Sequence, residues 1–146
     1  MKTKFNSYKE EIKSSTVIIL EIDELKYYKI SEYFPGKVRD LYNIFRDKVK
    51  ELNIKFKDYF YLPIDVVGFS TEVAIKGENF ALAKIIASEL YHTIINFKPE
   101  LSIKIGIGYG DITFLSNRLH YSNGPVLIKV GRAVDNRKND GIEIVD

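Results

Sequence analysis

Three basic residues, Lys129, Arg132 and Arg137, recur at short spacing near the end of the chain. The segment that carries them begins at Gly124-Pro125, a pair typical of a helix start, and we expect the three side chains to project near one another from that helix. Neighbouring cations bind phosphate groups well, but exposed helices also carry basic residues that form surface or interface salt bridges. The spacing alone is therefore consistent with a phosphate site and with a structural role.

Other common catalytic and metal-binding patterns do not occur in this sequence. His92 and His120 have no second histidine or cysteine at ligand spacing, which argues against a zinc site. Cysteine is absent, so a disulfide framework is excluded. Neither a Ser/His/Asp arrangement nor a Walker-type phosphate loop is present. We therefore expect none of these classes of chemistry.

A glycine-rich strand precedes the basic helix. Residues 102–112 read as a strand, and Gly106, Gly108 and Gly110 fall on one of its faces. Their spacing differs from the dinucleotide fingerprint Gly-x-Gly-x-x-Gly, which also opens a helix rather than lying inside a strand. We therefore expect these glycines to permit close backbone packing rather than direct ligand contact.

Two kinds of apolar pattern predict the elements that must position these residues. The nearly continuous apolar run 16–22 predicts a central strand that is covered on both faces. Apolar residues at three- and four-residue spacing predict one helix after Pro35-Gly36 and a second over 80–95, whose buried stripe includes Ile85. A similar pattern near the N-terminus predicts a short helix, and we assign residues 1–14 to a helical extension.

The middle of the chain predicts a hairpin. Strands over 59–62 and 66–75 are expected to flank a turn at Pro63-Ile64-Asp65, and residues 118–121 are expected to form another short strand. The element order is then β-α-β-β-α-β, followed by a strand, a helix and a terminal strand. This order predicts a single α+β domain over residues 1–146 with a ferredoxin-like βαββαβ core and helices on one face of its sheet. A doubly wound sheet is disfavoured, because the middle strands connect through a hairpin rather than a helix.

Composition and charge describe a globular protein. Of the 146 residues, 45% are hydrophobic and 29% are charged, and the formal net charge is +2. The basic residues of 46–57 are interspersed with acids, as on a solvated helix surface, so we do not expect a nucleic-acid partner. No apolar run approaches the ~20 residues of a membrane span. Residues 1–5 lack the apolar core of a signal peptide, so we expect a cytoplasmic protein with no membrane partner.

The last third of the chain resembles the class III nucleotidyl cyclases and the related SatD-like proteins. Cyclases carry a strand of the type Ile-Gly-Ile-x-x-Gly-Glu-Val, which residues 105–112 match. They then carry Gly-Pro-x-Val-Asn-x-Ala-Ala-Arg-Leu on a helix, and residues 124–133 follow that pattern in register. Residues 141–144 close the match. Over the earlier two thirds, only the order of the elements supports the resemblance.

The resemblance implies a set of site residues. Arg132 falls at the position of the transition-state arginine, a catalytic cation that stabilises developing phosphate charge, and with Lys129 it would bind the nucleotide. Asp23, or Glu21 two residues earlier on the same strand face, and Asp65 fall near the two aspartates with which cyclases hold Mg²⁺ or Mn²⁺. Cyclase domains complete their site across a two-fold interface, so the resemblance also implies a homodimer.

The chain departs from the cyclase pattern at several positions. Ile128 replaces the asparagine that orients the ribose, and bulky residues follow Asp23 where cyclases have a small-residue phosphate cradle. Around the expected hairpin, cyclases have lysine, two spacers and Gly-Asp, whereas residues 61–65 contain neither that lysine nor that glycine. The resemblance therefore implies a degenerate cyclase-like protein that binds a nucleotide or phosphate ligand, or that acts as a regulatory homodimer.

Two other functions remain open at this point. One is an active, divergent nucleotidyl cyclase or nucleotidyltransferase that uses two divalent metal ions held by Asp23 and Asp65. The other is a nucleic-acid-binding ferredoxin-like module, in which Tyr59 and Tyr61 would stack on bases. The sequence does not decide whether the chain is an enzyme.

Overall fold

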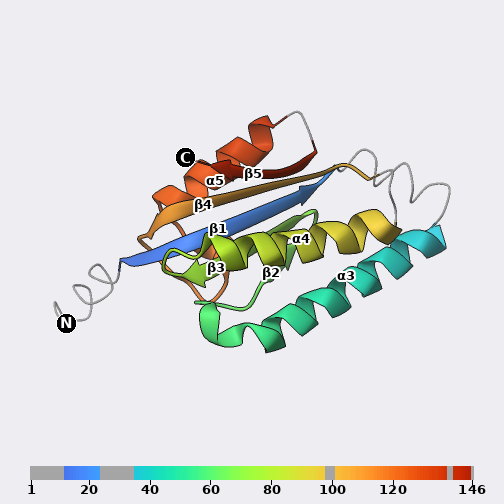
Figure 1. Cartoon of the computed structure of the whole chain (residues 1–146), viewed down its shortest axis with the longest axis horizontal. Coiled ribbons are helices and arrows are strands. Elements are labelled where there is room, and N and C mark those ends of the chain that lie inside the picture. Colours follow the sequence, from blue (N-terminus) through green and yellow to red (C-terminus); the bar gives the residue numbers. More distant parts are fainter. Residues whose placement is uncertain (1–11, 24–34, 98–100, 138–139, 146) are drawn as a thin grey trace.

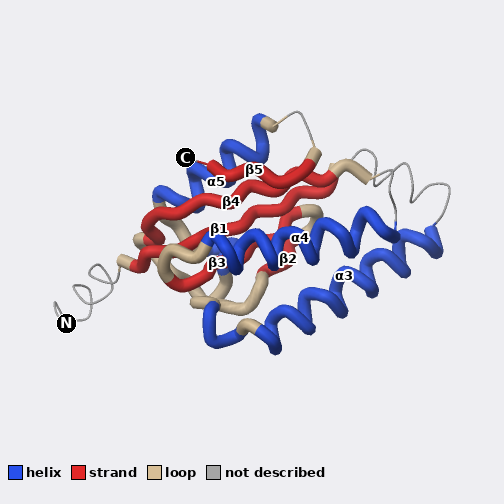
Figure 2. The backbone as a smooth tube through the Cα atoms, in the orientation of Figure 1, coloured by secondary structure: helices blue, strands red, loops and turns tan. Residues whose placement is uncertain are grey.

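The computed structural model describes residues 12–23, 35–97, 101–137 and 140–145. These residues form one five-stranded sheet in the order β2-β3-β1-β4-β5, together with three α-helices and two short 3-10 helices. Figure 2 shows the strands as a single layer with helices packed against it. No helix in this part of the chain is both long and apolar enough to cross a membrane. The predicted N-terminal extension lies mostly outside the described residues.

The elements largely follow the predicted order. The strands are β1 (Lys13–Ile22), β2 (Asp65–Val67), β3 (Ser70–Lys76), β4 (Ile103–Ile112) and β5 (Gly141–Val145). The α-helices are α3 (Pro35–Lys55), α4 (Phe80–Phe97) and α5 (Pro125–Asn136), and the 3-10 helices are η1 (Lys57–Tyr59) and η2 (Leu119–Tyr121). Residues 118–121, which were expected to form a strand, instead contain η2. Lys13 and Ser14, predicted as the end of the helical extension, belong to β1.

The central strand is β1, as the apolar run predicted. It pairs antiparallel with β3 on one side and β4 on the other, and β5 adds parallel to β4 at the edge. Because successive side chains alternate, Ile18 and Leu20 pack in the cluster with α3 and α4, whereas Val17 and Ile19 pack in the cluster with α5. Two helices therefore cover one face of the sheet and α5 covers the other (Figure 1). This is the predicted ferredoxin-like α+β core with an added helix and strand.

The two helices of the first face bury regular apolar stripes. The buried stripe of α3 is Leu41, Phe45, Val49 and Leu52, and that of α4 is Leu82, Ile86, Leu90 and Ile94. Ile85 was expected in the second stripe but is 53% exposed. The reason is its position three residues after Leu82, to the side of a stripe whose members are spaced by four.

The hairpin between these helices differs from the prediction. Its turn is Gly68-Phe69, between β2 and β3, rather than Pro63-Ile64-Asp65. Gly68 has φ +59°, a left-handed conformation that glycine adopts without strain. The expected strand over 59–62 is not formed, since Phe60 makes only an isolated bridge to Ile75. Pro63, which follows this segment, has no backbone N–H to donate to a neighbouring strand. A glycine, and not the proline, therefore makes the reversal.

The glycine ridge of β4 (Gly106, Gly108 and Gly110) sets the position of α5. Val134, Val130 and Val126 lie above these three glycines in the same order. A Cβ atom at Gly108 would lie 2.6 Å from Cγ2 of Val130, and one at Gly106 would lie 2.8 Å from Cγ2 of Val134. Both distances are too short for real carbon contacts. The expectation that these glycines permit close backbone packing is confirmed.

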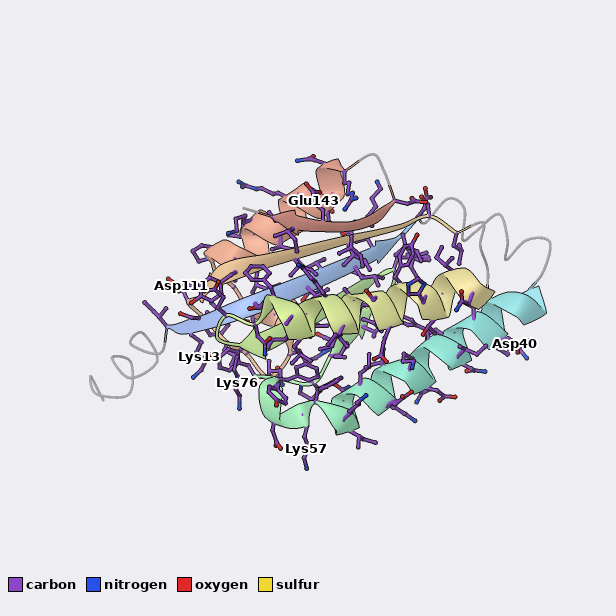
Figure 3. All side chains as sticks on the ribbon, in the orientation of Figure 1. Lys13, Asp40, Lys57, Lys76, Asp111 and Glu143 are labelled. Carbon is purple, nitrogen blue, oxygen red and sulfur yellow. The ribbon has the colours of Figure 1, made fainter. Side chains whose placement is uncertain are left out.

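The start of α5 is pressed against the end of β4. Pro125 is the first helical residue, as the Gly-Pro pair predicted. A Cβ atom at Gly124 would lie 2.5 Å from the carbonyl oxygen of Asp111, so a larger residue would push the helix start away. Figure 3 shows Asp111 at the same end of the sheet as Lys13, where β1 begins. The opposite end of the sheet, where β1 stops, holds the candidate site.

Gly108→Ala should lower the free energy of unfolding by about 1–3 kcal/mol, because the added methyl group overpacks the contact with Val130. Gly131→Ala, in α5, is the matched control: its Cβ would meet only Cδ1 of Ile19, at 3.7 Å. Since alanine is preferred to glycine within a helix, the control should stabilise the protein by about 0.5–1 kcal/mol. Urea unfolding followed by circular dichroism measures both changes. Equal effects of the two substitutions would contradict the close packing of α5 on β4.

Candidate functional site

A cleft of about 410 Å³ opens at the end of the sheet where β1 stops. Here the last residues of β1 meet the β2–β3 turn and the start of β4, and Glu21 lies opposite both Ser70 and Lys104. The described residues that line the cleft are Glu21, Ile22, Asp23, Val67, Phe69, Ser70 and Lys104. The cleft therefore gathers two carboxyl groups and one ammonium group at one end of the sheet.

Glu21 lies beside a second carboxyl group, that of Asp135 in the last turn of α5. A neighbouring negative charge, or a hydrogen bond to the protonated form, disfavours the ionised form of a carboxyl group. Burial, followed by the hydrogen bond and the negative charge of Asp135, raises the pKa of Glu21 from 4.5 to about 7. Lys104 opposes this shift by favouring the carboxylate. Glu21 is thus about half protonated near neutral pH.

Asp65 lies outside the cleft, buried at the start of β2. Its carboxylate accepts hydrogen bonds from Nε (3.1 Å) and Nη2 (2.5 Å) of Arg118 and from the backbone N–H of His120 (3.1 Å). Burial raises the pKa of Asp65, but these hydrogen bonds and the Arg118 charge outweigh it and hold the pKa below its ordinary value. Nδ1 of His120 also lies 3.8 Å from Oε1 of Glu72. Asp65 thus fastens the segment that contains η2 to the sheet.

The structure does not bring Asp23 and Asp65 together. Asp65 lies opposite Glu72 of β3, which lies opposite Ile19 of β1, four residues before Asp23. Two inter-strand steps and four residues of strand separate their backbones by roughly 16 Å, whereas carboxylates that hold one ion lie within about 2.6 Å of it. Among the described residues, no three acidic or histidine side chains form a metal-binding group. These donors do not fit the two-ion centre that the resemblance implied.

The observed position of the turn changes which residues align with the cyclase hairpin pattern. When the glycine of Lys-x-x-Gly-Asp is placed at Gly68, the lysine position holds Asp65 and the aspartate position holds Phe69. Phe69 lines the cleft. An aromatic ring therefore stands where the pattern requires the second carboxylate.

The three basic residues of the last third do not converge on a common site. Nζ of Lys129 donates to the carbonyl oxygen of Tyr109 (3.0 Å), and Arg137 donates to that of Ile105 (3.3 Å). Arg132 is exposed and forms no hydrogen bond or ion pair within the described ranges. None of the three is among the described residues of the cleft. Arg132 instead shares an outward-facing strip of α5 with Ile128, which is 45% exposed.

A smaller apolar cavity, of about 220 Å³, adjoins the cleft. It lies between α3, the end of α4 and the β2–β3 hairpin, and it shares Ile22 and Phe69 with the cleft. Its other described lining residues are Leu41, Tyr42, Phe45, Val66, Gly68, Thr71 and Ile94. The site thus has a charged part and an apolar part, with two side chains in common.

Sequence reasoning missed Lys104, Asp135 and Arg118. Lys104 could have been noticed as the charged residue on the same face of β4 as the three glycines. In the structure it lies opposite Glu21. Which residues meet there depends on the register of β1 with β4 and on where α5 ends, and neither follows from local pattern. The contact of Arg118 with Asp65 is also long-range, since 53 residues separate the two in the sequence, so local pattern does not reveal it.

Comparison with known proteins defines the class of fold. No family model matches the chain, and a search of curated proteins found no match. The sheet order, with two helices on one face and α5 on the other, is an α+β fold of the nucleotidyl cyclase type.

Two solved structures share this architecture. The crystal structure of the adenylyl cyclase CyaB from P. aeruginosa matches with a TM-score of 0.66 and 15% identity, over 92% of this chain and 77% of that one. Vibrio cholerae LapD S helix-GGDEF-EAL, bound to c-di-GMP, matches with a TM-score of 0.51 and 16% identity, over 98% of this chain but only 33% of that one. These likenesses establish the cyclase-like fold, and the resemblance to SatD-like proteins stays a prediction.

Glu21→Gln should reduce the loss of stability between acid and alkaline pH. Because the pKa of Glu21 is raised in the folded protein, the folded state holds more protons between pH 4.5 and about 7, so its stability falls as pH rises through that window. Glutamine keeps the size and shape of glutamate without the charge. The variant should be more stable than the wild type by about 1 kcal/mol above pH 7, a value reduced for solvent screening, and equal to it below pH 4.5.

Urea unfolding at a series of pH values measures this difference. Glu78→Gln is the control, because Glu78 is exposed and lies outside the cleft. A stability difference between wild type and Glu21→Gln that does not vary with pH would contradict the raised pKa of Glu21.

Proposed function

We propose that this chain is a catalytically degenerate protein of the nucleotidyl cyclase fold that binds a nucleotide or related phosphate ligand as a regulatory homodimer. The observation that carries the proposal is the composition of the cleft. It contains one cation, Lys104, beside Glu21 and Asp23, and it presents Phe69 where a second ion-holding carboxylate is required. Cyclase chemistry depends on metal ions that neutralise the developing phosphate charge. A cleft of this kind is better suited to holding a phosphate group than to transferring it.

The adjoining apolar cavity favours a nucleotide over a simple anion as the ligand. A nucleotide has a flat, weakly polar base and a charged phosphate tail, and the site has an apolar part and a charged part side by side. The fold adds support by analogy, since CyaB is an adenylyl cyclase, although a shared fold does not by itself determine activity.

Lys104→Met should weaken ATP and GTP binding by about tenfold or more, because it removes the charge-assisted hydrogen bond of the cleft. Lys84→Met, at an exposed position of α4 outside the cleft, should leave affinity unchanged. Isothermal titration calorimetry with Mg²⁺ present measures both variants. In parallel, incubation with each nucleoside triphosphate and Mn²⁺ should give no cyclic or linear product by chromatography.

Two results would contradict the proposal in different ways. Product formation that Glu21→Gln abolishes would support the alternative of an active, divergent cyclase or nucleotidyltransferase. Absence of binding by every nucleotide and by inorganic triphosphate would remove the ligand-binding role altogether.

The outward-facing strip of α5 supports the dimer. Ile128 exposes almost half of its surface, and Arg132 follows it one helical turn later. Exposed apolar residues beside arginine are typical of protein interfaces. In a symmetric pair, this strip would also carry Arg132 towards the partner rather than towards the cleft of its own chain.

Ile128→Asp should convert the dimer to a monomer, because it places a charge in the apolar part of the proposed interface. Ile54→Asp is the control: Ile54 is 77% exposed but lies on α3. Sedimentation velocity at several protein concentrations distinguishes the species. A wild-type protein that stays monomeric, or a dimer that both substitutions leave intact, would contradict this interface.

A further inference from the structure

A buried threonine whose side chain has no hydrogen bond among the described residues lines the apolar cavity. Thr71 of β3 is 2% exposed, lines the cavity, and forms no side-chain hydrogen bond within the described parts of the chain. Because Thr71 is almost fully buried and borders the cavity, the cavity is the space from which a ligand can approach its side chain.

Other buried hydroxyl groups of the same sheet behave differently. Oγ of Ser15 donates to the carbonyl oxygen of Ile75 at 2.8 Å, and Oγ1 of Thr16 donates to that of Gly77 at 2.8 Å. This is the normal condition, because a buried polar group without a partner costs about 1–3 kcal/mol. Thr71 is an exception to this rule, and it borders the cavity. We therefore look for its hydrogen-bond partner in a bound ligand.

The remaining lining suits a flat apolar group. The rings of Tyr42, Phe45 and Phe69 border the cavity, the other described side chains are aliphatic, and none is charged. Aromatic side chains pack well against planar rings in stacked or edge-on arrangements. The volume of about 220 Å³ lies below the ~300–1,000 Å³ of a site that encloses a whole drug-sized ligand. The cavity therefore has room for one ring system, and the rest of the ligand must extend into the cleft.

We propose that this cavity binds the heteroaromatic base of a nucleotide, with the Thr71 hydroxyl group hydrogen-bonded to the edge of the base. The phosphate tail passes Phe69, which borders both spaces, and reaches Lys104 in the cleft. The placement of the tail rests on the proposed function. The ring site stands separately, on the cavity and on the unpaired hydroxyl group.

Thr71→Val tests the ring site, because valine keeps the shape of threonine and removes its hydroxyl group. Affinity for adenosine, guanosine and their triphosphates should fall about tenfold, the value of one hydrogen bond, while affinity for inorganic triphosphate stays unchanged. The urea midpoint should stay the same or rise, since a methyl group replaces an unpaired polar group. Calorimetric titrations and urea unfolding measure the two quantities on the same preparations.

A second pair of variants tests the mouth of the cavity without disturbing the core. Tyr42→Ala should weaken nucleoside binding, and Tyr59→Ala should not, although the two side chains are similarly exposed at 54% and 52%. Tyr59 lies on η1, outside the cavity. Bound nucleoside should also shift the methyl resonances of Leu41 and Ile94, which line the cavity.

The outcomes separate this inference from the proposed function. Lower stability of Thr71→Val with unchanged nucleoside affinity would show a structural hydroxyl group and would overturn the ring site. Binding of inorganic triphosphate without any nucleoside binding would overturn the ring site and leave the phosphate-binding proposal standing. Thr71-dependent binding of nucleosides without triphosphate binding would support the ring site and contradict the proposed function.

Discussion

Close packing of α5 on the glycine ridge of β4 determines what the second face of the sheet presents. No side chain of β4 separates the two elements where Val126, Val130 and Val134 meet the ridge. The last turn of α5 is thereby positioned so that Asp135 lies beside Glu21 of β1. The same packing leaves the Ile128–Arg132 strip facing outward. A larger residue on the ridge would push α5 away from the sheet. This would move Asp135 away from Glu21 and would also shift the Ile128–Arg132 strip, so one steric constraint connects the fold to the candidate site.

The features that sequence reasoning predicted correctly are local ones. The glycine alternation of β4, the Gly124-Pro125 helix start and the apolar run of β1 each depend on neighbours in the chain, and each is found in the structure. From them the order of the elements and the α+β fold class followed. The β2–β3 turn was placed wrongly, because Pro63 has the stronger turn preference while the reversal depends on the positive φ of Gly68.

The site was less predictable than the fold because its contacts are long-range. Asp65 looked suitable for a metal ion as long as its partner was unknown. Its hydrogen bonds with Arg118 give it a structural task instead. Asp23 and Glu21 do line the cleft, but Lys104 and Asp135 meet Glu21 only through strand register and helix length. A buried threonine without a partner is likewise invisible until the strands are paired and the cavity beside it is seen.

The fold of this protein does not by itself determine its chemistry. It shares the architecture of an adenylyl cyclase at 15% identity, while a phenylalanine stands at the turn where the cyclase pattern has a carboxylate, and burial and Asp135 raise the pKa of Glu21 to about 7. The measurement that tests this account most directly is the number of Mn²⁺ ions bound per chain at saturating non-hydrolysable ATP analogue, determined by electron paramagnetic resonance. The account predicts no more than one ion per chain, because the described residues of the cleft contribute carboxyl groups only from Glu21 and Asp23. Two ions per chain with the coupled spectrum of a close pair would contradict it.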